Sequence, residues 1–370
     1  MSGSARAIEV PIIIFAFDRA PYLRRFCLSL KAQQGVVLDE RRIFLLQDGA
    51  VSRRSGVRYA QDEAMAESVL AFRSVFPQGQ VVASPENLGI AGNLRRGERL
   101  AFEALDADLA YFFEDDLELG PFYLLMMERL REALAPHPQV AYFAAYGDHR
   151  VTPRPDRVNL MPLDHHWGFG LRRDAWRRIS EELAPYYALL DRTDYRHRNH
   201  LAIHRWQEGR DMAIDKSSQD AMKAVAAARL GYARVMTEMC FARYIGEKGA
   251  SFNERIFRQL GYDRMVPAER GDLPIEPVDA AMLQRMVAIH QTRFRRFREQ
   301  EFPAFLRRFA ESNWDMDRML ERDDVTALYR LLLDRLPEGE HIYEECVGRQ
   351  SVAARRLIIV CSNEFRSRNF

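Results

Sequence analysis

The chain has 370 residues with 54 basic and 53 acidic side chains, and 47% of its residues are hydrophobic against 29% charged. This composition is typical of globular proteins and excludes disorder, a collagen-like repeat and a disulfide scaffold. The length allows two domains. The near-neutral charge offers no basic face to nucleic acid, whose phosphates must be neutralised by several cations, so we predict no nucleic-acid partner.

Cysteine spacing and hydropathy indicate the compartment. Cys27, Cys240, Cys346 and Cys361 lie far apart and form neither a C-x-x-C pair nor a zinc-ligand spacing. No run approaches the roughly 18 apolar residues of a membrane span, and the N-terminal segment does not resemble a signal peptide. We predict a cytoplasmic protein without a transmembrane segment, with peripheral attachment at the inner face of the membrane as an alternative.

Short apolar runs bounded by polar turns recur through the first half of the chain and have the length of buried strands. They cover residues 10–17, 42–47, 80–83, 109–113 and 140–145. Stretches with helical periodicity separate them, at residues 20–34, 59–75, 89–107 and 120–135. Strands that alternate with helices predict an α/β fold, with a mostly parallel sheet covered by helices on both faces.

Polar residues follow the first three predicted strands. Phe17-Asp18-Arg19 follows the first strand, Asp48-Gly49 the second, and Glu86-Asn87-Leu88-Gly89 the third. Each could be a turn or a helix cap, because Asp, Asn and Gly favour such positions. Ligands of parallel sheets bind outside the carboxyl ends of the strands. The three ends together therefore predict a rim that hydrogen-bonds a base and ribose and meets a phosphate.

The fourth predicted strand runs directly into Glu114, Asp115 and Asp116, with Glu118 close behind. Adjacent carboxylates repel one another, and a divalent cation can offset that cost. Oxygen ligands suit Mg²⁺ and Mn²⁺, which bridge a carboxylate to substrate phosphates. The alternative is an acidic turn that caps the helix starting near Pro121.

These motifs resemble those of GT-A (Rossmann-like) glycosyltransferases. The resemblance rests on the strand ending in Glu114-Asp115-Asp116, on Asp48-Gly49, and on Asn87-x-Gly89 with Asn93. The acidic triplet is similar to that of the N-acetylglucosaminyltransferase I-like branch, and the resemblance covers about residues 9–255. It implies a metal-dependent transfer of a hexosyl or N-acetylhexosaminyl group from a nucleoside diphosphate sugar, UDP-linked in the first instance, to an acceptor hydroxyl.

The resemblance also implies roles for individual residues. Asp116 would ligate a Mn²⁺ or Mg²⁺ ion, and Asp115 would bond the nucleotide ribose or the sugar. The remaining residues implied in donor binding are Phe17, Arg19 and Asp48 at the base and ribose, and Asn87, Gly89 and Asn93 near the donor.

Residues 165–170, His-His-Trp-Gly-Phe-Gly, resemble the segment that lines the donor sugar and the acceptor in this family. Gly168 would let the backbone approach the sugar, and Trp167 would stack on its apolar face. The alternative is a turn with a core tryptophan.

Asp220 stands at the start of a predicted helix, after Ser217-Ser218-Gln219. It matches the acid that serves as catalytic base in inverting members of the family, because an attacking hydroxyl must lose its proton. The alternative is a helix cap, and retaining members need no such base.

A glycine loop covers residues 244–251, after a predicted strand at 233–237. The family commonly places a histidine ligand of the metal near this loop, whereas Tyr244 stands here. Lys248 could meet the diphosphate as a point charge. Solvation at the surface is the alternative for this lysine.

Composition divides the chain after the sheet. We predict a catalytic domain at residues 1–262, a linker rich in Pro, Gly and charge at 263–279, and a helical domain at 280–370. The tail from Tyr329 to Phe365 is similar to a short helical bacterial module of unassigned activity that is often attached to glycosyltransferases. We expect this domain to serve packing or homo-oligomer formation.

The sequence thus predicts a bacterial, inverting glycosyltransferase of surface glycan or glycoconjugate synthesis, with a glycan, lipid-linked or protein acceptor. A sugar nucleotidyltransferase is one alternative, but residues 17–21 lack the glycine-rich, basic phosphate loop that it requires. A non-catalytic module that binds a sugar or a partner is the other.

Overall fold

The computed structural model describes residues 5–247, 254–312 and 318–369. The strands are β1 (Arg6–Ile8), β2 (Ile12–Ala16), β3 (Val36–Leu38), β4 (Ile43–Gln47), β5 (Gln80–Ala83), β6 (Leu109–Glu114), β7 (Leu117–Leu119), β8 (Val140–Ala144), β9 (Leu160–Pro162), β10 (Phe169–Arg172), β11 (Ala233–Thr237) and β12 (Ala242–Tyr244). The helices of the first 260 residues are α1 (Ala20–Lys31), α2 (Asp62–Val75), α3 (Gly89–Arg99), α4 (Tyr123–Leu134), α5 (Arg173–Glu182), α6 (Ala184–Leu190), α7 (His200–Glu208), α8 (Gln219–Arg229) and α9 (Glu254–Gln259). The remaining helices are α10 (Ala280–Arg296), α11 (Phe302–Ser312), α12 (Arg322–Leu333), α13 (Glu340–Cys346), α14 (Val352–Cys361) and α15 (Asn363–Asn369).

The main sheet has eight strands in the order β5-β4-β2-β6-β10-β8-β11-β9. Strands β5, β4, β2 and β6 pair in parallel, and β8 pairs in parallel with β11. The antiparallel members are β10, inserted between β6 and β8, and β9 at the edge. Every strand predicted from the first half of the sequence is present as a strand of this sheet.

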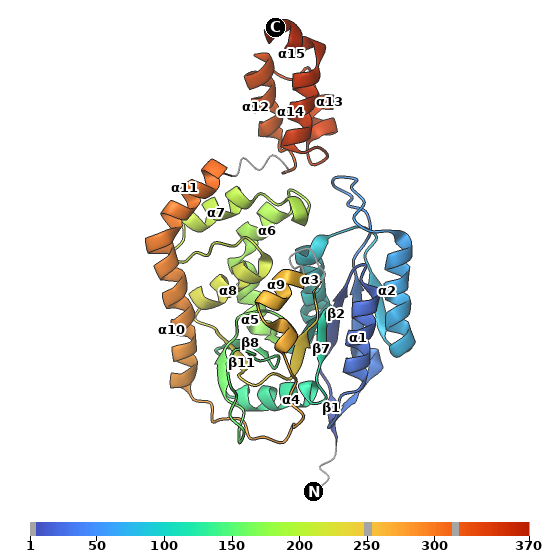
Figure 1. The fold of residues 1–370 in the computed structure, drawn as a ribbon, viewed down its shortest axis with the longest axis vertical. Coiled ribbons are helices and arrows are strands. Elements are labelled where there is room, and N and C mark those ends of the chain that lie inside the picture. The colour runs from blue at the N-terminus through green and yellow to red at the C-terminus, as the bar shows by residue number, and fades with distance from the viewer. Residues whose placement is uncertain (1–4, 248–253, 313–317, 370) are drawn as a thin grey trace.

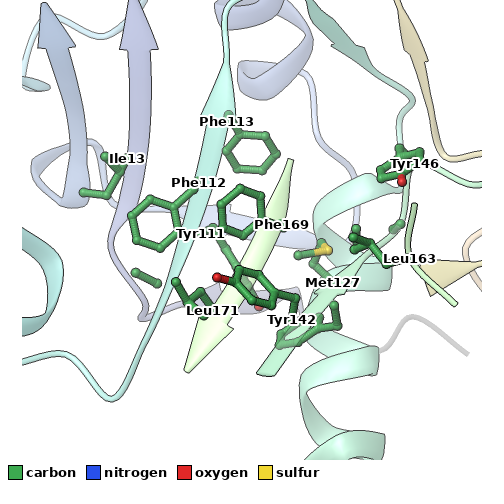
Figure 2. Close-up of a cluster of buried hydrophobic side chains, with 14 of the residues drawn as sticks. Ile13, Tyr111, Phe112, Phe113, Met127, Tyr142, Tyr146, Leu163, Phe169 and Leu171 are labelled. Atoms are coloured by element: carbon green, nitrogen blue, oxygen red, sulfur yellow. The ribbon is translucent and has the colours of Figure 1, made fainter. Parts of the chain in front are cut away.

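Successive residues of the central strand β6 are buried on opposite faces of the sheet, and Figure 2 shows Tyr111, Phe112 and Phe113 within the core. Phe113 packs on Phe26 of α1, and Tyr111 donates a hydrogen bond to Glu128 of α4. Phe112, on the other face, packs on the rings that follow α3 and begin β10. Helices α1, α2 and α4 thus cover one face, and α3, α5 and α8 cover the other. The predicted fold class, a Rossmann-like α/β sheet covered on both faces with a helical C-terminal region, is confirmed.

The C-terminal helices pack in two groups. Helices α10 and α11 lie along the α/β unit, where Leu283, Met286 and Val287 of α10 join its main core. Helices α12–α15 form a second core of their own and stand as a separate group at one end of the molecule (Figure 1). The predicted linker is pinned to the α/β unit, because Ile275 pairs with Val158 and Leu273 is buried. The domain boundaries at 262 and 280 stay a prediction, and this packing favours a boundary between α11 and α12.

Within the described residues, no helix combines the length and the apolar character that a membrane crossing requires.

Candidate active site

The carboxyl ends of β2, β4 and β6 meet at one edge of the sheet, since the three strands are neighbours and run parallel. We call this edge, with the loops that follow these strands, the carboxyl edge. Its loops carry Arg19, Asp48 and the pair Asp115–Asp116. The start of α8, with Asp220, reaches the same edge, because Asp220 and Glu114 line one space. The sheet therefore brings together residues that lie far apart in the sequence.

Arg19 holds the two aspartates of the acidic strand end. Its Nη2 donates to Asp115 and, at 3.0 Å, to Oδ2 of Asp116, while its Nε lies 3.3 Å from Oδ2 of Asp115. Both aspartates are buried, and 28% of the arginine side chain is exposed. Burial alone lowers the pKa of Arg19, but the charges of Asp115 and Asp116 outweigh it and leave the pKa raised. The guanidinium is therefore a fixed cation at this site.

Two acids of the strand end, Glu114 and Asp115, have pKa values above those of free carboxyl groups. Burial raises the pKa of Glu114 well above its ordinary value, and the charges of Asp116, Asp220 and Asp115 raise it further. Burial likewise raises the pKa of Asp115 to about 7, although Arg19 opposes the shift. Desolvation favours the neutral carboxyl group, so the arginine offsets only part of the cost of burying these acids.

Asp48 joins the loops after β4 and β5. Its carboxylate accepts hydrogen bonds from the backbone N–H of Gly49 at 2.9 Å and of Leu88 at 2.8 Å, and from the Asn87 amide at 3.2 Å. Burial raises the pKa of Asp48, while those backbone donors lower it. Gly89 has φ +66°, and a Cβ there would lie 2.8 Å from Cβ of Tyr195, so a side chain is excluded. The contacts of Asp48 and Asn87 shape this loop, and their predicted roles at the nucleotide stay predictions.

Asn93 and Phe17 have structural partners as well. The buried amide of Asn93 donates to the carbonyl of Leu46, and Arg96 donates to the Asn93 carbonyl and to backbone carbonyls at the ends of β4 and β5. These contacts fasten α3 to the sheet. The carbonyl of Phe17 accepts a hydrogen bond from Gln47 at 2.8 Å.

Asp220 lies in the first turn of α8 but does not cap it. The cap is Ser218, whose hydroxyl accepts from the N–H of Ala221. Burial raises the pKa of Asp220 to about 6, although Lys223, Arg234 and Lys216 lower it. A carboxyl group that titrates near the working pH suits a general base. The cap alternative is therefore wrong, whereas the base role stays a prediction.

Asp220 lines a narrow space beneath the carboxyl edge that is too small, as it stands, to admit a water molecule. His166 and Gln219 also line it, and neither ring nitrogen of His166 nor Oε1 of Gln219 has a hydrogen-bond partner within the described part of the chain. Burial and then the charge of Arg234 lower the pKa of His166, so its ring is neutral. Unpaired buried polar groups are rare, and a bound ligand is one of the partners that can complete their hydrogen bonding. The space is lined by Phe15, Leu94, Phe112, Phe113, Glu114, His166, Phe169, Gln219, Asp220 and Lys223.

Lys223 and Glu98 form a buried ion pair that the sequence analysis missed. Lys223 lies one turn after Asp220 on α8, and Glu98 lies on α3. Burial lowers the pKa of Lys223, but the charge of Glu98 leads the effects that raise it overall. A signal was available: Lys223 is one of only four lysines and stands in the apolar run Ala-Met-Lys-Ala-Val-Ala-Ala-Ala.

Trp167 lies in an aromatic stack beside Asp116. Its ring is sandwiched between His165, with centroids 4.5 Å apart, and Tyr244, with centroids 4.3 Å apart and planes at 4°. Both faces of the indole are therefore covered, so stacking on a sugar requires one neighbour to move. The Tyr244 hydroxyl lies 3.5 Å from Oδ2 of Asp116, a long contact for a hydrogen bond.

Gly168 makes the turn from this stack into β10. It has φ +51°, and a Cβ there would lie 2.7 Å from Leu117 and 2.9 Å from the Tyr123 hydroxyl. Its carbonyl accepts a hydrogen bond from that hydroxyl. Only glycine fits this turn without strain. Lys248, the other donor-binding candidate of this region, lies outside the described residues.

The fit of a divalent metal can be tested on the donor atoms present. Through the described ranges, no three His, Cys, Asp or Glu side chains gather as a metal cluster. Asp116, the predicted ligand, is engaged by Arg19. A Mg²⁺ ion can be held by one or two carboxylates with substrate phosphates, but here a guanidinium lies against the candidate ligand Asp116 and against Asp115 beside it. This arrangement does not fit a resident metal, and the predicted Mn²⁺ or Mg²⁺ cofactor stays a prediction.

No family model and no curated protein matches the sequence. Among solved structures, the chain is similar to the mannosyltransferase PcManGT from Pyrobaculum calidifontis in complex with GDP-Man and Mn²⁺, at 12% identity and a TM-score of 0.42 over 99% of this chain and 83% of that one. It is also similar to residues 1–349 of S. aureus TarS, at 11% identity and a TM-score of 0.36 over 80% and 74% of the chains. A third likeness is to an active-site mutant of LgtC, at 12% identity and a TM-score of 0.26 over 48% and 65%. At these scores the likenesses carry no argument about activity, which must rest on the residues of this chain.

Proposed function

We propose that this protein is a glycosyltransferase that moves a sugar from a nucleoside diphosphate sugar, in the first instance a UDP-sugar, to an acceptor hydroxyl with inversion. The observation that carries the proposal is the meeting, at the carboxyl edge, of a cation-bearing acidic strand end with the buried Asp220. The first provides a place for a diphosphate. The second provides a proton acceptor a short way along the same edge.

The unpaired polar groups beneath the edge support an acceptor pocket. His166 and Gln219 lack partners within the described residues, and Asp220 and Glu114 share their space. An acceptor hydroxyl placed there would donate to Asp220 and accept from the ring N–H of the neutral His166. The space must widen before a sugar can enter, so binding would be accompanied by side-chain movement.

The proposed reaction is a single displacement. Asp220 takes the proton of the acceptor hydroxyl as its oxygen forms a bond to the anomeric carbon of the donor sugar. The bond from that carbon to the diphosphate oxygen breaks, and its electron pair leaves with the nucleoside diphosphate. Arg19 is placed to stabilise the departing negative charge, because a fixed cation needs no reorganisation during the reaction.

Lys223 would act as a positioning residue for Asp220. Its ammonium group is the first of the charges that lower the pKa of Asp220 against the effect of burial. Glu98 holds the lysine from the opposite helix. Removing the lysine would therefore leave more of Asp220 protonated at neutral pH and unable to serve as a base.

We further infer a role in bacterial surface glycan or glycoconjugate synthesis, with a glycan, lipid-linked or protein acceptor. Helices α12–α15 would serve assembly or acceptor recruitment. They carry large apolar side chains in water, notably Leu331 on α12 and Leu357 and Ile358 on α14. Such side chains suit a surface that a second copy or an acceptor covers.

A thermal-shift screen of nucleoside diphosphate sugars tests the proposal, because a ligand that binds the native state raises its apparent stability. We expect one nucleotide class to raise Tm, and the responding donor then to give a transfer product with inverted anomeric configuration by NMR. A retained configuration would remove the base role from Asp220. A response to nucleoside triphosphates with sugar phosphates, and none to diphosphate sugars, would favour a nucleotidyltransferase instead.

A further inference from the structure

A side chain of the chain itself, Arg19, already offsets part of the negative charge of the acidic strand end. Arg19 meets Asp115 through Nε and Nη2, and the same Nη2 also reaches Asp116. The guanidinium thus contacts both the carboxylate of Asp116, which would hold a divalent ion, and that of its neighbour Asp115. One edge of the planar fork is committed to the acids.

The other side of the guanidinium is available. Nη1 of Arg19 makes no hydrogen bond to any residue in the described ranges, and the side chain is partly exposed. Its two N–H groups are donors of the kind that phosphate oxygens accept. The backbone holds the arginine in place, because the Arg19 carbonyl accepts the first hydrogen bond of α1, from Leu23, and the guanidinium lies 5.3 Å from the ring centroid of Tyr22.

We propose that Arg19 takes the place of a divalent cation at the carboxyl edge and meets the donor diphosphate through Nη1, so that donor binding needs no metal. This inference rests on the proposed function and adds how the diphosphate is recognised. Asp115 and Asp116 would then orient the arginine, and the diphosphate would complete its hydrogen bonding.

Calorimetry on the wild-type protein provides the first test. UDP-, GDP- and dTDP-glucose are titrated into protein treated with EDTA, and again in the presence of Mn²⁺. We expect one donor to bind in EDTA with a Kd that Mn²⁺ leaves unchanged. Binding that appears only with Mn²⁺ overturns the inference and leaves the proposed function standing. If none of these donors, nor any other nucleoside diphosphate sugar, binds under either condition, the proposed function itself fails, and the inference falls with it.

Substitutions of Arg19 test its contribution to donor binding independently of a metal. Arg19→Gln should weaken donor binding in EDTA by about 10- to 100-fold, the usual worth of hydrogen bonds to a charged group. Arg19→Lys keeps the positive charge without the planar guanidinium. Its donor affinity in EDTA should therefore lie between those of the wild type and Arg19→Gln. Arg25→Gln is the matched control, because Arg25 lies on α1, just after Arg19, and pairs with the half-buried Glu118 at 2.9 Å; its donor affinity should not change.

Asp116→Asn best distinguishes a metal held by Asp116 from Arg19 as the cation that meets the diphosphate. A metal held by Asp116 predicts that this variant loses donor binding. Arg19 as the cation predicts that donor affinity in EDTA is not weakened, since the amide still accepts a hydrogen bond from the arginine and carries no negative charge toward the diphosphate. Circular dichroism and Tm confirm that each variant is folded before it is titrated.

Discussion

The carboxyl edge and the helices α12–α15 differ in how deeply their charged side chains are buried. Asp115 at the edge and the pair Glu98–Lys223 on the adjoining helices α3 and α8 are almost fully buried. In the helical group, the pair Arg322–Glu340 is exposed on both sides, at 57% and 60%. Burying an ion pair costs about as much desolvation energy as the pairing returns, so apolar residues would often serve stability equally well. Buried charged groups therefore indicate a functional role, whereas exposed charged groups mainly contribute to solubility.

One buried charge in the helical group refines this comparison. Arg355 of α14 is buried and donates to the hydroxyl of Tyr329 on α12, so it joins two helices of the small core. The acid nearest to it, Glu345 at 3.6 Å, is itself exposed. At the carboxyl edge, by contrast, the acids lie together, and the charges of Asp116, Asp220 and Asp115 raise the pKa of Glu114. A single buried charge can therefore be structural, whereas a buried group of interacting charges points to a site.

The largest expected effect is on turnover. Asp220→Asn should lower kcat by about 10²–10⁴-fold, the usual worth of a positioned general base, with donor Kd little changed. Steady-state kinetics and calorimetry measure the two quantities separately. An unchanged kcat would indicate that Asp220 is structural, and buried charges at the carboxyl edge would then no longer differ in role from Arg355.

The next prediction concerns the ion pairs. Lys223→Met should lower the free energy of unfolding by about 3–5 kcal/mol, because it leaves Glu98 buried without its partner. Arg322→Gln, which breaks the exposed pair, should leave Tm almost unchanged. Denaturant unfolding of both variants gives the comparison. The double variant Lys223→Met/Glu98→Leu should recover much of the loss, since no charge then remains unpaired.

The titration of the buried Asp220 carboxyl group should make the stability of the protein depend on pH. Its native pKa is about 6, and an unfolded aspartate titrates near 3.9. Between these values the native state binds the proton more readily, so this group makes the protein less stable as pH rises from about 4 to about 6. Asp220→Asn should therefore raise Tm at pH 8 relative to wild type and show no such gain at pH 4.

The same carboxyl group must be ionised to act as a base. Wild-type kcat should accordingly rise with pH through about 6, and the residual kcat of Asp220→Asn should lack that rise. Lys223→Met, if folded, should move the rise to higher pH, which a purely structural role for the lysine would not do.

The smallest expected effect is that of removing helices α12–α15. A chain that ends after α11 keeps α10 on the α/β core and should bind the donor with unchanged Kd, as calorimetry would measure once circular dichroism shows a folded protein. Cutting near Tyr262 would instead strip Leu283, Met286 and Val287 from the main core. A folded protein that lost donor affinity on removal of α12–α15 alone would assign part of the site to them.

Sequence reasoning located the sheet because buried parallel strands are nearly continuous apolar runs. Residues 233–237 match β11 at both ends, and 80–83 match β5. It missed β10 and β9, because Gly170 and Arg172 interrupt the apolar character of β10, and β9 has only three residues and ends at Pro162. It also missed the partnership of Arg19 with Asp115, which are 96 residues apart and meet only because β2 pairs with β6. Long-range pairs of this kind follow from strand order, which a single sequence does not reveal.

The reversed strand β10 has a consequence for how such a protein could be re-engineered. Because it runs against its neighbours β6 and β8, its beginning, and not its end, reaches the carboxyl edge. The segment before it, His165–Gly168, is anchored by β10 on one side and by Tyr146, which exchanges hydrogen bonds with the backbone of His165, on the other. A replacement loop grafted between these anchors would reshape the wall of the space that His166 lines, while the strands that precede Arg19, Asp48 and Asp116 kept their register.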